Sequence, residues 1–165
     1  MKKVIFIILL ITAQVVFSQQ KTTFKDQDVI ISLIEDYFAQ VDKKNIDGMY
    51  SFFAMPLVLH FNADKPYHIK DKGEFDLVFN AWKRSPNADF QRTRIDSISV
   101  NNAFANYICV ADVTFSRLDR KGNPINRQRV LYNLVKGGKY GPLGLLIKWF
   151  MKWKIYMITN VEMVE

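Results

Sequence analysis

Two side chains in this sequence have the chemistry of a proton acceptor. Asp112 lies in the middle of a strand-like run, and His60 ends a short apolar run. A carboxylate can act as a base where its pKa and reach suit the proton being moved, and a histidine exchanges protons near neutral pH. For Asp112 the favoured interpretation is an ion pair with Arg129 or Arg127 on an outer sheet face. For His60 a hydrogen-bonded or surface position is favoured.

The other reactive residue types form no recognisable site. His60, His68 and Asp64 lack a metal-ligand spacing, so we expect no metal centre. Cys109 is the one cysteine and lies in an apolar strand, which excludes an intramolecular disulfide and indicates a buried, inert thiol. The sequence has no phosphate-binding glycine loop, nucleophile elbow or Ser/His/Asp constellation. We therefore expect no cofactor.

The chain is basic, but its basic residues are scattered. It has 23 Lys and Arg against 16 Asp and Glu, with a formal net charge of +7. Scattered charge is typical of a solvated surface, whereas nucleic-acid binding favours a basic patch or stripe, so no nucleic-acid partner is expected. The segment 143–154 mixes leucine, tryptophan and lysine and could lie on an anionic membrane. A position at the edge of the core explains its alternation equally well and is favoured.

Residues 1–18 are typical of a secretory signal peptide. Two lysines precede a mostly apolar run over 4–17, and Ser18 suits cleavage before Gln19. The apolar run is shorter than the roughly twenty residues needed to cross a bilayer. We therefore expect a bacterial protein that is exported to the periplasm or the medium, with one domain over 19–165.

The front half of the chain has helical periodicity. Apolar residues recur every three or four positions over 26–44, which places them on one face of a helix. A shorter helix is expected over 46–54, ended by Pro56. A third helix is expected from Asp71, because an aspartate followed three residues later by Glu74 resembles a capping box.

The back half has the pattern of strands. Expected strands cover 57–61, 88–100, 103–118, 125–136 and 148–160, with a turn at Asn101 and Asn102. The order of these elements predicts an α+β fold, in which three N-terminal helices cap a curved antiparallel sheet and enclose a pocket.

The central hairpin, 103–118 with 125–136, is regular enough to predict a register. Matching the apolar phases of its two strands predicts Val113 beside Val130 and Ala111 beside Tyr132. The same register would bring Asp112 close to Arg129 or Leu131.

The sequence resembles the nuclear transport factor two-like superfamily, and within it the small SnoaL-like bacterial proteins. The resemblance is carried by KNIDGMY at 44–50, by the hairpin with its KGNP turn at 121–124, and by the closing Trp153, Lys154 and Ile155. It implies a cystatin-like cone whose pocket lies between the helices and the concave sheet. The chain departs from the family pattern at KYGPLGLLIKWF, which replaces a tight glycine turn.

The resemblance also implies where a ligand would bind. Tyr50 and Trp82 lie on the helices expected to cover the mouth of the cone, and Phe53, His60 and Tyr132 complete the expected pocket. Few polar groups among many apolar ones are typical of a small-molecule site.

These observations favour an exported domain that binds a small, largely apolar molecule without established catalysis, as a homodimer through the outer sheet face. One alternative is an enzyme of the isomerase or dehydratase type, with Asp112 or His60 as base and a tyrosine as hydrogen-bond donor. The other is a non-catalytic protein interaction module whose pocket is filled by its own side chains. An open cavity containing a perturbed acid or histidine would distinguish them.

Overall fold

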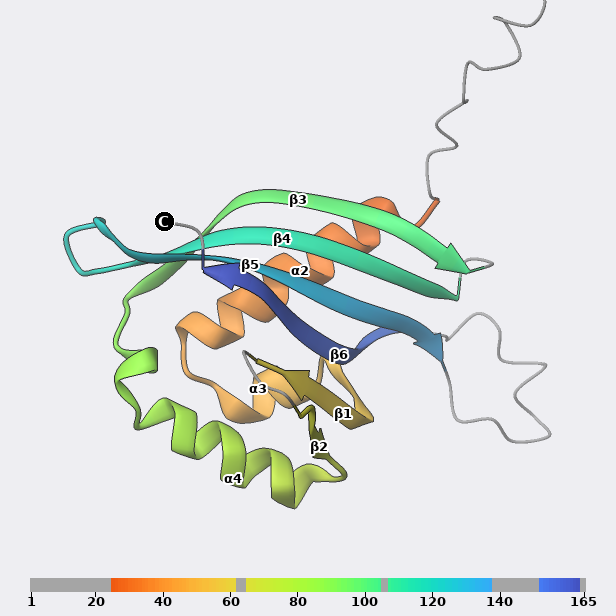
Figure 1. The fold of residues 1–165 in the computed structure, drawn as a ribbon, viewed down its shortest axis with the longest axis horizontal. Coiled ribbons are helices and arrows are strands. Elements are labelled where there is room, and N and C mark those ends of the chain that lie inside the picture. Colours follow the sequence, from red (N-terminus) through yellow and green to blue (C-terminus); the bar gives the residue numbers. More distant parts are fainter. Residues whose placement is uncertain (1–24, 62–64, 105–106, 138–151, 164–165) are drawn as a thin grey trace, which may run out of the picture.

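Helices lie against one face of a curved six-stranded sheet in the computed structural model, which describes residues 25–61, 65–104, 107–137 and 152–163 (Figure 1). The strand order is β2-β1-β6-β5-β4-β3. The elements are α2 (Gln27–Asp42), α3 (Ile46–Tyr50), β1 (Phe53–His60), β2 (Tyr67–Ile69), α4 (Lys72–Lys83), the 3-10 turn η1 (Pro86–Ala88), β3 (Arg92–Phe104), β4 (Ile108–Leu118), β5 (Pro124–Gly137) and β6 (Lys152–Met163). The expected α+β, cystatin-like fold is confirmed. One neighbouring pair, β1 with β6, is parallel rather than antiparallel.

Helix α2 covers the concave face of the sheet, as its apolar stripe predicts. The stripe residues Ile30, Ile34, Tyr37, Phe38 and Val41 are buried. Rings join the helix to the sheet, with Phe38 and the β4 residue Phe115 4.9 Å apart between ring centroids. The main core therefore lies between α2 and the sheet.

The expected helix over 46–54 ends early, at Tyr50, and Phe53 begins β1 instead. The cause is a tertiary partner, because β1 pairs with β6 and the Ile155 amide donates to the Phe52 carbonyl at 2.9 Å. Such pairing outweighs local helix preference. Pro56 lies within β1, at an irregularity in its pairing with β6, where a missing amide is tolerated.

Helix α4 begins as expected. The Asp71 carboxylate accepts a hydrogen bond from the Glu74 amide at 3.0 Å, and Glu74 accepts one in return from the Lys70 amide at 2.8 Å. The α4 residues Phe75 and Phe79 are buried on the inner side of the helix. The short edge strand β2, which the sequence pattern did not reveal, pairs with β1.

The expected turn at Asn101 and Asn102 is wrong, because both residues pair with β4 inside strand β3. A long antiparallel partner supplies hydrogen bonds that outweigh the turn preference of asparagine. The hairpin register is confirmed: Val113 pairs with Val130, Ala111 with Tyr132, and Asp112 with Leu131.

The last strand, expected over 148–160, is described from Lys152 and continues to Met163. Its first residues, the insertion over 139–150 and the expected signal peptide over 1–18 lie outside the described residues. Within the described ranges, no helix is long and apolar enough to cross a membrane.

Candidate ligand cavity

The core face of the β4–β5 hairpin changes from apolar to polar toward the hairpin loop. Val113 pairs with Val130, the next residues on the same face are Phe115 and Gln128, and the next pair is Arg117 with Asn126. Alternate residues of a strand share a face, so the same surface that forms the core ends in a cation and two amides. Polar groups on a core face need partners, which makes this end of the sheet a candidate site.

A cavity of about 430 Å³ opens beside this polar surface. One wall is apolar and comes from α2, α3, β1 and α4, with the residues Val41, Met49, Leu59, Val78, Phe79 and Trp82. The other wall, here called the polar wall, comes from β4, β5 and β6, with the residues Arg117, Asn126, Gln128 and Asn160. Volume and lining fall within the range of small-molecule sites.

Arg117 is held in place by aromatic rings. The carbon of its guanidinium lies 3.8 Å from the centre of the Phe90 ring and 5.0 Å from that of Phe115. Its Nη1 donates a long hydrogen bond of 3.4 Å to the Thr93 hydroxyl. Burial lowers the pKa of Arg117, an effect opposed by Tyr132, Tyr37 and Asp42. An arginine starts from so high a pKa that it stays charged at neutral pH.

No carboxylate of the described residues forms an ion pair with Arg117. The acid whose charge raises the pKa of Arg117 is Asp42. The Asp42 oxygens accept hydrogen bonds from the Thr93 amide at 3.1 Å and from its hydroxyl at 2.6 Å. Asp42 thus positions Thr93, which in turn contacts Arg117.

Two amides of the polar wall have unsatisfied atoms. The side-chain oxygens of Asn126 and Asn160 are buried, and neither accepts a hydrogen bond within the described part of the chain. Buried polar atoms in proteins nearly always have a partner. The cavity therefore offers two hydrogen-bond acceptors that the described residues leave unused.

Two tyrosines complete the inner end of the cavity. Tyr37 and Tyr132 line it and pack edge to face, with ring centroids 5.8 Å apart. Burial raises the pKa of Tyr37 to about 12 and that of Tyr132 well above its usual value. Both hydroxyls therefore remain protonated and can donate hydrogen bonds to a ligand.

The structure brings only part of the expected pocket together. Trp82 and Tyr132 line the cavity, whereas Tyr50 and Phe53 do not. Tyr50 packs against Phe75, with ring centroids 5.2 Å apart, and Phe53 is buried in the core. Contact of any of the expected pocket residues with a ligand stays a prediction.

His60 is not among the residues that line the cavity. It is half-buried at the end of β1, in the opposite phase from the buried Leu57 and Leu59, and it pairs with Thr159 of β6. Its side chain therefore starts from the face of β1 that does not form the core.

Asp112 lies on the outer face of the sheet, since its neighbours Ala111 and Val113 are buried on the inner face. Its carboxylate forms two hydrogen bonds with the Arg129 guanidinium, from Nη2 at 2.8 Å and from Nε at 3.0 Å. The hydrogen bonds from Arg129 lower the pKa of Asp112. The ion pair favoured on sequence grounds is therefore present.

The polar wall was not expected from the sequence. Its signal was nevertheless available, because extending the predicted hairpin register by four residues places Arg117 and Asn126 on the apolar face. Among the described residues, no group of three or more His, Cys, Asp or Glu side chains could hold a metal ion, so none is assigned to one.

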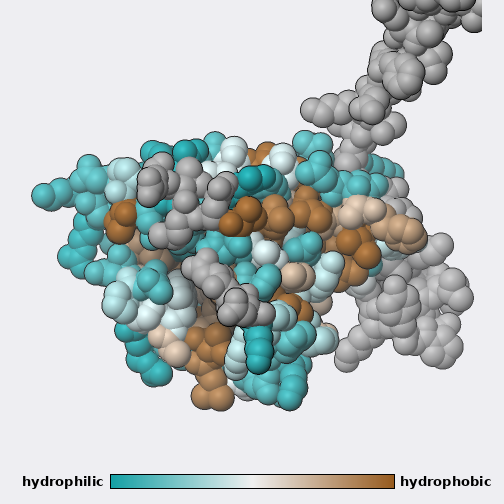
Figure 2. Space-filling model, in the orientation of Figure 1, coloured by the Kyte–Doolittle hydropathy of each residue, from teal (hydrophilic) through white to brown (hydrophobic). Residues whose placement is uncertain are grey.

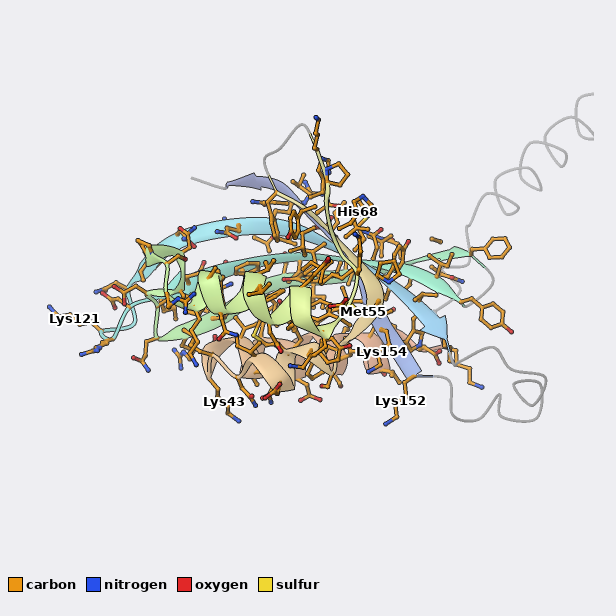
Figure 3. All side chains as sticks on the ribbon, turned by 90° about the horizontal axis from the view of Figure 1, so that it is seen from below. Lys43, Met55, His68, Lys121, Lys152 and Lys154 are labelled. Carbon is orange, nitrogen blue, oxygen red and sulfur yellow. The ribbon has the colours of Figure 1, made fainter. Side chains whose placement is uncertain are left out.

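A wider, more open hollow of about 820 Å³ lies between the start of α2 and the start of β6. Lys152 and Lys154 line it and project from β6 far from the hairpin tip at Lys121 (Figure 3). Asp26 also lines this hollow. Its carboxylate accepts hydrogen bonds from the Lys136 ammonium at 2.5 Å and from the Trp153 indole nitrogen at 2.9 Å. These groups pair with one another, whereas the Asn126 and Asn160 side-chain oxygens of the polar wall accept no hydrogen bond within the described ranges.

Comparison with known proteins agrees with the architecture. The family model described as "NTF2-like protein (DUF6841)" matches residues 26–140. No curated protein matches the chain in sequence.

Solved structures share the fold at low sequence identity. A protein with a cystatin-like fold from Nostoc punctiforme is 15% identical, with a TM-score of 0.59, over 82% of this chain and 88% of that chain. An NTF-2 like protein from Shewanella oneidensis is 16% identical, with a TM-score of 0.55, over 82% and 98%. The CaMKII hub of S. rosetta is 12% identical, with a TM-score of 0.57, over 84% and 96%. At these identities the likeness concerns the fold.

Proposed function

This chain belongs to the NTF2-like family, and we propose that it binds a small molecule in the cavity between α4 and the concave face of the sheet. The observation that carries the proposal is the cavity itself, about 430 Å³ in volume, with an apolar wall opposite a polar wall. In that polar wall the side-chain oxygens of Asn126 and Asn160 accept no hydrogen bond from the described residues. A cavity filled by its own side chains would be expected to satisfy those atoms.

The cavity supports binding rather than proton transfer. Asp112 is engaged by Arg129 on the opposite face of the sheet, and His60 is not part of the lining. Both tyrosines of the cavity have raised pKa values and so are hydrogen-bond donors rather than bases near neutral pH. The proposed activity is therefore reversible binding.

Blocking the cavity tests this proposal. The neutral apolar dye N-phenyl-1-naphthylamine should gain fluorescence with the wild-type protein, because the cavity excludes water from it. Val78→Trp places a large side chain in the cavity and should abolish the gain, whereas Leu77→Trp, at a neighbouring α4 position that is 75% exposed, should not. Equal dye binding by both variants would contradict binding in this cavity.

We also propose that the protein is a homodimer through the outer sheet face. This face carries half-buried apolar side chains at Val110 of β4 and at Leu131 and Val135 of β5. Figure 2 shows hydrophobic residues gathered in a band over these two strands. Such a band favours a partner surface over water. Light scattering with Leu131→Glu, compared with the exposed control Leu77→Glu, tests the proposal: only Leu131→Glu should give a monomer.

Export remains a proposal carried by the sequence of residues 1–18. Intact-mass measurement on protein from a bacterial host with its export machinery should give a chain that begins at Gln19. A mass that includes Met1 and the apolar segment would contradict cleavage.

A further inference from the structure

We propose that the ligand of this cavity is a small carboxylic acid with an apolar body, and that Arg117 binds its carboxylate. This inference rests on the proposed function and names the chemical class of its ligand. It starts from one observation: Arg117 is a charged side chain that lines the cavity without an acidic partner among the described residues.

Most donor groups of Arg117 have no hydrogen-bond acceptor among the residues that the structure describes. A guanidinium has five N–H donors, and the hydrogen bond that Arg117 donates to the Thr93 hydroxyl is long, at 3.4 Å. The planar fork of these donors matches the two oxygens of a carboxylate. Because Phe90 and Phe115 hold the guanidinium between them, little side-chain entropy is lost when a ligand binds.

The neighbouring charged residues, Asp42 and Lys44, neither pair with Arg117 nor take its place in the cavity. Asp42 is occupied by two hydrogen bonds from Thr93. Lys44 lies on the same aromatic ring as Arg117, 3.5 Å from the Phe90 centroid, but its ammonium donates to the Phe90 carbonyl at 3.0 Å. It does not line the cavity. Arg117 is thus the cation that this group of charges presents to the cavity.

The other groups around the cavity fit the same ligand. Tyr37 and Tyr132 line the same cavity as Arg117 and stay neutral near pH 7, so their hydroxyls can donate hydrogen bonds to an anion. The amides of Asn126 and Asn160 can turn to donate to an acid or to accept from a hydroxyl substituent. Opposite them, Val78, Phe79 and Trp82 offer contact to an apolar body.

A matched pair of ligands separates charge from shape. Phenylacetate and phenylacetamide have nearly the same size, and each can be titrated as a competitor of N-phenyl-1-naphthylamine. The wild-type protein should bind the carboxylate about tenfold or more tightly than the amide, because a hydrogen bond to a charged group is the stronger kind. Arg117→Met should weaken phenylacetate binding by about 10- to 100-fold and phenylacetamide binding by much less, because the amide carries no charge for Arg117 to pair with.

Arg92→Met is the control, because Arg92 is exposed on the adjacent strand β3, where it pairs with Leu118 beside Arg117. It should leave both competitors unchanged. If Arg117→Met does not fold, Arg117→Lys keeps the positive charge but loses the planar fork, and should lower the preference for the carboxylate by about tenfold.

The two proposals fail in different ways. Equal wild-type affinities for phenylacetate and phenylacetamide, or an undiminished carboxylate preference in a folded Arg117 variant, would overturn the role of Arg117 while dye binding stays intact. Dye binding that survives Val78→Trp would instead overturn the cavity as the binding site. Calorimetric titration of wild-type and Arg117→Met protein with phenylacetate then still decides whether Arg117 binds a carboxylate.

Discussion

Arg117 and Asn126 lie directly opposite each other in the β4–β5 ladder, on the face of the sheet that forms the core. A permanent cation therefore faces a neutral amide whose buried oxygen accepts no hydrogen bond in the part of the chain that the structure describes. Leaving a charge without its partner in a protein interior is destabilising. The arrangement favours a site completed by an external anion over one built for stability.

Asn126→Asp should stabilise the fold and impair binding at the same time. The substitution keeps the shape of the side chain and gives Arg117 a carboxylate directly across the ladder. We expect a gain of about 1–3 kcal/mol in the free energy of unfolding, because Arg117 can turn to form a charge-assisted hydrogen bond with the new carboxylate. Thermal unfolding measures the gain, and phenylacetate affinity should fall by about tenfold or more.

The control for this variant is Asn101→Asp, on an exposed part of β3. It adds the same charge away from Arg117. It should change neither the free energy of unfolding nor the phenylacetate affinity appreciably. Stabilisation of the Asn126 variant with unchanged phenylacetate binding would show that Arg117 does not receive the ligand carboxylate.

Asp26 should make stability depend on acidity. Its hydrogen bonds to Lys136 and Trp153 lower its pKa below the ordinary value of 3.8, although burial opposes the shift. Because the folded state favours the charged form, this stabilisation is complete above pH 3.8 and is lost as the pH falls through the lower folded-state value. Asp26→Asn should therefore cost about 1–3 kcal/mol at pH 7, and progressively less as the pH falls through the lowered folded-state pKa.

Denaturant unfolding of Asp26→Asn and of wild-type protein at several pH values measures this difference. Asp36→Asn, at an exposed position farther along α2, is the control for removing an acid from the same helix. A penalty for Asp26→Asn that stays constant down to pH 2 would rule out the ion pair as its source.

The elements that could be predicted from the sequence are those whose signal is local. The stripe in α2, the Asp71 cap of α4 and the β4–β5 register each depend on residues close in the chain, and all three are confirmed. The early end of α3 and the straight passage of β3 through Asn101 depend on partner strands distant in sequence. Local preference cannot reveal such partners.

The same distinction applies to the candidate site. The family resemblance implied pocket positions for Trp82 and Tyr132, and both line the cavity. Arg117 was overlooked because an arginine beside a hairpin loop resembles an ordinary surface charge in sequence. Only its pairing with Asn126 and its contact with Phe90 place it on the inner face.

Cys109 should be unreactive in the folded protein. Its side chain is fully buried, and burial raises the pKa of its thiol to about 12, so almost no thiolate exists at pH 8. A thiol reagent such as Ellman's reagent should react slowly with native protein and stoichiometrically in guanidinium chloride. Rapid reaction of the native protein would show that β4 opens readily at this point.

Asp112→Asn should affect stability but not the cavity. The ion pair with Arg129 lies on the outer face, where Asp112 is 22% and Arg129 42% exposed, so its loss should cost only about 0.5–1 kcal/mol at pH 7. The pKa of Asp112 is lowered in the folded state, so the cost should disappear as the pH falls through this lowered pKa. Dye and phenylacetate binding should match the wild-type protein within about twofold, because this interaction does not reach the cavity. A large loss of binding in a fully folded Asp112→Asn variant would instead connect the outer face to the ligand site.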